Sequence, residues 1–155
     1  MEKTMKTREA VALYMLLNGA SLSAIKTGHE KYAIIKALRQ LKQVAVPFQE
    51  FRDLAAQRLA SPDHERHAQT EAAWREQTRQ WEEHGRVGEQ PALPQDTQEY
   101  IRRFTADLNT MLEEEGDKDV TLDLPPLGED TMAGLLEGNG WDVQQAAYID
   151  EWMNS

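Results

Sequence analysis

The sequence has no cysteine and no long hydrophobic run. Zero cysteines among 155 residues exclude disulfides, thiolate metal sites and cysteine nucleophiles. No stretch approaches the roughly 18 consecutive apolar residues that a membrane-spanning helix requires, so we expect no membrane association. The apolar segment 10–17 follows a polar start and has no small-residue cleavage site after it, which is unlike a signal peptide. We therefore predict a protein that works in the cytoplasm.

The sequence also lacks the patterns of common catalytic and cofactor sites. The glycines at 134–140 do not have the spacing of a dinucleotide-binding loop. One small group of residues has side chains that could ligate a metal: Asp63, His64, Glu65 and His67. These residues fall at a predicted helix start, where the helix dipole favours acidic side chains without any metal. We therefore predict no enzyme, no cofactor, and no catalytic, cofactor-binding or metal-binding residue.

Charge is distributed unevenly along this acidic chain, whose net charge is −10. Residues 1–61 contain ten Lys/Arg against five Asp/Glu, whereas residues 113–155 contain one basic residue, Lys118, against twelve acidic ones. Such asymmetry bears on partners and docking rather than on the fold. The basic part could follow a phosphate backbone, but the acidic part would compete for it. We therefore do not expect direct nucleic-acid binding.

Helical periodicity covers most of the sequence and predicts a mainly α-helical protein. A chain of this length suits one domain, which we place over 1–155. The longest apolar stripe covers about Glu30 to Leu59, and we expect Pro47 to bend or divide this helix. A second stripe covers Gln95 to Glu115. We predict that the two long helices form an antiparallel hairpin or bundle.

Shorter helices complete a predicted helical core at about 6–115. Arg8 to Asn18 is a short, strongly apolar helix. A third helix is predicted over about Pro62 to His84, with Ser61 as its cap. The glycines and prolines at 85–94 predict a loop.

The pattern changes in the acidic part at 119–155. Strict alternation over Asp119 to Leu124 predicts a half-buried strand. A lone strand leaves its backbone groups unpaired, so we predict a minor two-stranded β element, with Ser21 to Ile25 or a copy from another subunit as partner. Two short helices, Glu129 to Glu137 and Asp142 to Met153, are predicted to form a small C-terminal helical cap, with Asp142 capping the second.

The large aromatic residues are the candidate protein-interface residues. Exposed tryptophans anchor interfaces disproportionately. The candidates are Trp74 and Trp81 in the third helix and Trp141, Tyr148 and Trp152 in the last helical region. The alternative is that the C-terminal aromatics pack their helix onto the core.

Two blocks of the sequence resemble small acidic helical proteins encoded by bacteriophages and prophages. The first is 31–42 (KYAIIKALRQLK) followed by 48–59 (FQEFRDLAAQRL), and the second is 120–127 (VTLDLPPL) followed by an acidic helix start and a short terminal helix. The resemblance rests on hydrophobic pattern and order. The chain differs most from that pattern over 62–84 and in the loop after it. The family has no assigned activity, so the resemblance implies no functional residues.

We therefore predict a non-enzymatic interaction or assembly protein of phage or prophage type that acts through its helix surfaces. Its partner would be a protein, either a second copy in a homo-oligomer or a host or phage protein. Association with the virion is an alternative to a free protein in the host cytoplasm. Two other functions stay open: an acidic decoy or inhibitor of a host nucleic-acid-binding protein and, third, an enzyme.

Overall fold

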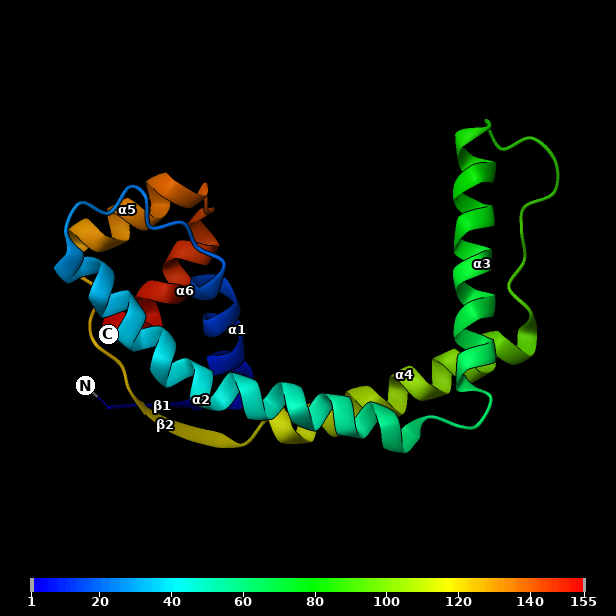
Figure 1. Cartoon of the computed structure of the whole chain (residues 1–155), viewed down its shortest axis with the longest axis horizontal. Helices are drawn as coiled ribbons and strands as arrows, with labels where there is room; N and C mark the ends of the chain where they lie inside the picture. The colour runs from blue at the N-terminus through cyan, green and yellow to red at the C-terminus, as the bar shows by residue number, and fades with distance from the viewer. Residues whose placement is uncertain (1, 155) are drawn as a thin grey trace. The chain divides into compact units, whose positions relative to one another are not determined.

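The computed structural model describes residues 2–154, most of which lie in helices (Figure 1). The predicted mainly α-helical fold with a minor two-stranded β element is confirmed. The chain divides into two compact units. Residues up to Phe51 and residues from Glu114 onward form the first unit, and Arg52–Glu113 form the second.

The first unit contains α1 (Thr7–Asn18), the first part of α2 (Gly28–Leu59), α5 (Glu129–Asn139) and α6 (Val143–Asn154). The last two correspond to the predicted C-terminal helices. The largest fully buried apolar side chains of the unit form one core and are Leu13, Leu17, Ile34, Leu41, Leu124, Leu135, Ile149 and Met153. Because burial of such a side chain stabilises a fold by about 1.5–3 kcal/mol, this core is the main source of stability in the unit.

A two-stranded antiparallel sheet joins segments far apart in the sequence. β1 (Glu2–Lys6) pairs with β2 (Asp119–Asp123). The predicted strand is confirmed, but both predicted partners, Ser21 to Ile25 and a copy from another subunit, are wrong. The sequence pattern does not reveal β1, because Met5 is its single apolar residue and therefore gives no alternation.

The segment 21–25 packs against α5 instead of pairing in a sheet. The Asn139 side chain accepts a hydrogen bond from the Ser21 N–H at 2.6 Å and donates one to the Ser21 carbonyl at 3.0 Å. Gly134 permits this close approach, since a Cβ at that position would lie 2.8 Å from the Ile25 side chain. The backbone N–H and carbonyl of Ser21 are therefore both bonded to α5 instead of to a strand.

The second unit contains the end of α2, α3 (His64–Glu83) and most of α4 (Gln95–Gly116). The Ser61 N–H donates a hydrogen bond to the Tyr100 hydroxyl at 3.1 Å, which ties the segment after α2 to α4. Antiparallel packing of α2 and α4 along their length stays a prediction.

The helix ends follow the sequence signals in part. α2 continues through the exposed Pro47, so it does not divide there. The prediction of Ser61 as the cap is wrong: Asp63 is the N-cap residue of α3, and its backbone carbonyl accepts the His67 N–H at 3.1 Å. Asp142 does cap α6, since its carboxylate accepts the Gln145 N–H at 2.8 Å and the Gln145 side chain accepts the Asp142 N–H at 3.1 Å.

Among the described residues, no helix combines the length and apolar character needed to cross a bilayer.

Candidate functional site

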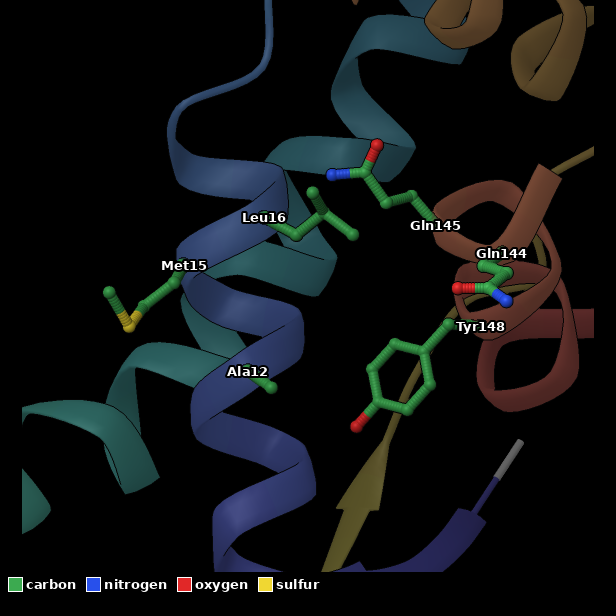
Figure 2. Close-up of a pocket in the computed structure, with 6 residues that line it drawn as sticks. All are labelled: Ala12, Met15, Leu16, Gln144, Gln145 and Tyr148. Carbon is green, nitrogen blue, oxygen red and sulfur yellow. The ribbon is translucent and has the colours of Figure 1, made fainter. Parts of the chain in front are cut away.

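An open apolar groove of about 610 Å³ lies between α1 and α6 in the first unit. Figure 2 shows the residues that line it. They are Ala12, Met15, Leu16, Gln144, Gln145 and Tyr148. The α1 side of the groove is entirely apolar, and the α6 side adds two amides and one phenol, so the groove offers a mainly apolar surface with few hydrogen-bonding groups.

The groove exists because α1 has more apolar residues than its core-facing side requires. Ala10, Leu13 and Leu17 point into the core and are buried. The adjoining face carries Ala12 and Met15, and the Met15 side chain is 71% exposed. In Figure 2, Ala12 and Leu16 project toward α6, whereas Met15, which is also in the lining, projects away from Tyr148.

α6 supplies the opposite wall through residues next to its own core-facing side. Ile149 and Met153 are buried in the core of the unit. Gln144 and Tyr148, one turn apart, lie beside this buried face and line the groove. Tyr148 is half-buried, and its ring reaches across toward α1 (Figure 2).

Tyr148 is the one ionisable residue among the six that line the groove. Its hydroxyl donates a hydrogen bond to the Glu9 carbonyl at 3.4 Å. Burial raises the pKa of the Tyr148 phenol, and the nearby carboxylates of Glu9 and Glu151 raise it further, against a smaller opposing effect of Arg8. The phenol is therefore protonated at neutral pH, so it can serve as a hydrogen-bond donor and not as a base.

Carboxylates border both ends of the groove. α1 and α6 run in opposite directions along it, because Tyr148 reaches Glu9 near the start of α1 whereas Gln145 lies level with Leu16 near its end (Figure 2). Glu9 and Glu151 therefore border one end together with Arg8, and the Glu9 carboxylate also accepts the Lys6 N–H at 2.8 Å. Asp142, hydrogen-bonded to Gln145, borders the other end. An occupant that fits this site would be apolar in its centre and positively charged on both sides.

The three C-terminal aromatic candidates belong to the first unit. Trp141, Tyr148 and Trp152 are partly buried and pack against its hydrophobic core. This packing agrees with the alternative considered from the sequence. Tyr148 alone among them also lines the groove.

Trp74 and Trp81 lie in the second unit, where they hold the segment after α3 against that helix. The Trp74 indole N–H donates to the Pro91 carbonyl at 3.1 Å, and the Trp81 indole N–H donates to the Gly88 carbonyl at 3.3 Å. The segment accordingly runs back along α3 (Figure 1). Both indoles therefore have a structural role in their own unit, and an interface role for any of the five aromatics stays a prediction.

The histidines considered as metal ligands form an aromatic cluster with α4. His67 is buried and stacks on Tyr100 with ring centroids 4.5 Å apart. Because a guanidinium can only donate, the Arg66 contact at 3.3 Å makes His67 Nε2 an acceptor, and Nδ1 then donates to the Thr97 hydroxyl at 2.8 Å. His64 Nδ1 lies 2.8 Å from the Tyr100 hydroxyl. Within residues 2–154, no group of three or more His, Asp or Glu side chains is arranged to hold a metal ion.

Sequence reasoning did not single out five of the six groove residues, namely Ala12, Met15, Leu16, Gln144 and Gln145. A signal was present in α1, where apolar residues occupy more than one face of a short helix. On α6, no sequence signal marks the two glutamines, since glutamine is ordinary on a solvated helix face.

Comparison of the chain with protein-family models, with curated proteins and with solved structures found no match. The resemblance to phage and prophage proteins therefore stays a prediction.

Proposed function

We propose that this chain is a protein-interaction or assembly protein and that it docks its partner in the groove between α1 and α6. The observation that carries the proposal is the groove itself, whose α1 wall is apolar and whose Met15 side chain is 71% exposed. An exposed apolar groove gives a partner an apolar surface to bury. A flexible, polarisable methionine in the lining suits a surface that adapts to a partner.

A role in binding agrees better with the groove chemistry than a role in catalysis does. General acid-base catalysis needs a group poised to exchange a proton near the working pH. The lining offers two glutamines and Tyr148, whose raised pKa keeps it protonated. These groups can orient an occupant through hydrogen bonds, which is what a docking surface needs.

Site-specific photo-crosslinking tests the proposal. A photoreactive amino acid placed at Met15 reports on the groove, and the same residue placed at Val87 is the matched control, because Val87 is 79% exposed but lies in the second unit. In extracts of cells that produce the protein, we expect a discrete adduct from position 15 and none from position 87. The added substitution Ala12→Arg, which places a charged side chain in the groove, should abolish the adduct.

The same adducts from both positions, or an adduct that survives Ala12→Arg, would overturn the assignment of the groove as the docking site. Circular dichroism on each variant separates loss of docking from loss of folding.

A further inference from the structure

The exposed face of α2 has the chemistry that the groove requires of its occupant. Five residues spaced four, four, three and four positions apart share one side of this helix. They form what we call the α2 stripe: Lys31, Ile35, Arg39, Lys42 and Val46. Ile35 is 44% exposed. The three stripe residues that follow it are exposed as well: Arg39, Lys42 and Val46.

The order of side chains along the stripe mirrors the order along the groove. Ile35 has a basic residue one turn before it, Lys31, and another one turn after it, Arg39. These two lie eight residues apart, which is about 12 Å along a helix. In the groove, Asp142 is hydrogen-bonded to Gln145 at one end of the apolar centre, and Glu151 lies near Tyr148 at the other end.

We propose that the occupant of the groove is the α2 stripe of a second copy of this chain. Ile35 of one copy then enters the apolar centre of the groove of the next copy. Lys31 and Arg39 reach the carboxylates at its two ends. The inference rests on the proposed docking function of the groove and adds the identity of the occupant.

Charge complementarity favours this contact over a symmetric contact between two grooves. The chain carries a net charge of −10, and two grooves facing each other would bring Glu9, Asp142 and Glu151 of both copies together. Like charges placed opposite each other disfavour an interface. The α2 stripe lies in the basic part of the sequence, so its approach to the groove is attractive at each end.

A contact between two different surfaces has a consequence for the assembly. Each copy keeps a free groove on one side and a free stripe on the other, so association continues from copy to copy. It stops only when the rotation between copies closes a ring; otherwise it produces an open filament. With any rotation other than a two-fold one, the product is larger than a dimer.

Light scattering on the purified full chain, followed with concentration, tests the inference through two variants. Ala12→Arg blocks the groove, and Ile35→Glu removes the apolar centre of the stripe. We expect the wild type to grow beyond a dimer as concentration rises, and each variant alone to raise the dissociation constant about tenfold or more, which corresponds to about 1.4 kcal/mol. Val87→Glu, at a more exposed apolar position in the second unit, should leave association unchanged.

Mixing the two variants gives the decisive result. The Ala12→Arg chain keeps an intact stripe and the Ile35→Glu chain keeps an intact groove, so an equimolar mixture should form a complex of two chains and grow no further. A mixture that stays monomeric would overturn the inference. So would a wild type that stays monomeric at every concentration, or an Ile35→Glu chain that assembles like the wild type.

Charge reversal tests the acidic ends of the groove. Arg39→Glu should weaken association, and so should Lys31→Glu. Adding Glu151→Lys should restore association to either the Arg39→Glu chain or the Lys31→Glu chain. The chain that regains association shows in which direction α2 lies in the groove. Rescue of neither would overturn the charge pairing.

The crosslinking experiment keeps this inference separate from the proposed function. An adduct at position 15 with twice the mass of the chain supports both the docking function of the groove and a second copy as its occupant. A discrete adduct of another mass, with a monomeric wild type, would overturn the second copy as occupant and leave the groove as a docking site.

Discussion

The two units of this chain are stabilised by different interactions. In the first unit, large apolar side chains such as Leu13 and Ile149 are fully buried in one core. In the second unit, the buried side chains among the described residues are Ala55, His67 and Thr97, and the last two hydrogen-bond to each other. A helical pattern therefore continues across this chain while the physical basis of stability changes from apolar burial to hydrogen bonds and aromatic stacking.

Truncation of a core leucine gives the largest expected contrast between the units. Leu13→Ala in the first unit removes a fully buried side chain and should lower the free energy of unfolding of that unit by about 2–5 kcal/mol. Leu108→Ala in the second unit removes a half-buried side chain and should cost about 1 kcal/mol. Hydrogen exchange followed by mass spectrometry measures both. Equal costs would remove the distinction between the units.

Gly134→Ala tests how tightly the first unit is packed. The new Cβ would lie 2.8 Å from the Ile25 side chain and 3.2 Å from the Ala24 carbonyl, so the segment must move away from α5. We expect a loss of about 1–3 kcal/mol in the free energy of unfolding, measured by chemical denaturation. Gly128→Ala is the control, because a Cβ there meets nothing within 4 Å. Equal effects of the two substitutions would show that the loop yields without cost.

His67→Ala tests whether the second unit depends on its polar cluster. The substitution leaves the buried Thr97 hydroxyl without its His67 partner and removes the stacking on Tyr100. We expect local destabilisation of about 1–3 kcal/mol, seen as faster hydrogen exchange in α3 and α4 and unchanged exchange in α1 and α6. His29→Ala, at an exposed position, should change neither. Unchanged exchange in α3 would contradict the role given to this cluster.

Tyr148 gives the smallest expected effect and concerns the first unit alone. Its raised pKa means that the folded protein holds the phenolic proton more tightly than the unfolded chain does. The resulting stability is complete below the ordinary tyrosine pKa of about 10 and is lost as the pH rises through the raised value. Tyr148→Phe should therefore reduce the decline of stability above pH of about 10. The denaturation midpoint of both proteins as a function of pH measures this difference, and parallel curves would contradict the prediction.

The sequence predicts the helices well because their apolar residues recur with helical spacing, as in α2 and α4. It does not predict β1, whose single apolar residue has no periodicity. It also does not predict where the chain divides into units, since apolar residues of α2 recur with helical spacing on both sides of the boundary at Phe51. Strand pairing also depends on contacts between distant residues, which a local pattern does not encode.

Of the residues that line the groove, sequence reasoning singled out Tyr148 alone, and it did not predict where the groove lies. An interface based on large aromatics led to Tyr148, which does line the groove, and to Trp74 and Trp81, whose indole N–H groups are instead bonded to the segment 88–91. The remaining groove residues become a site only when α1 and α6 lie antiparallel, and this arrangement is a property of the tertiary fold. The excess of apolar residues on α1 was the one usable signal.

The pairing of β1 with β2 fixes the order in which the protein can mature during synthesis. Thr4 and Thr121, whose hydroxyl groups hydrogen-bond across the two strands, are 117 positions apart. At roughly 5–20 residues per second, a ribosome needs about 6–23 s to add the intervening residues. All residues of the second unit emerge within this interval. During it, β1 exposes unpaired backbone groups, and α1 lacks α6 as its neighbour, so the nascent chain passes through a stage in which chaperones have access to surfaces that the finished protein covers.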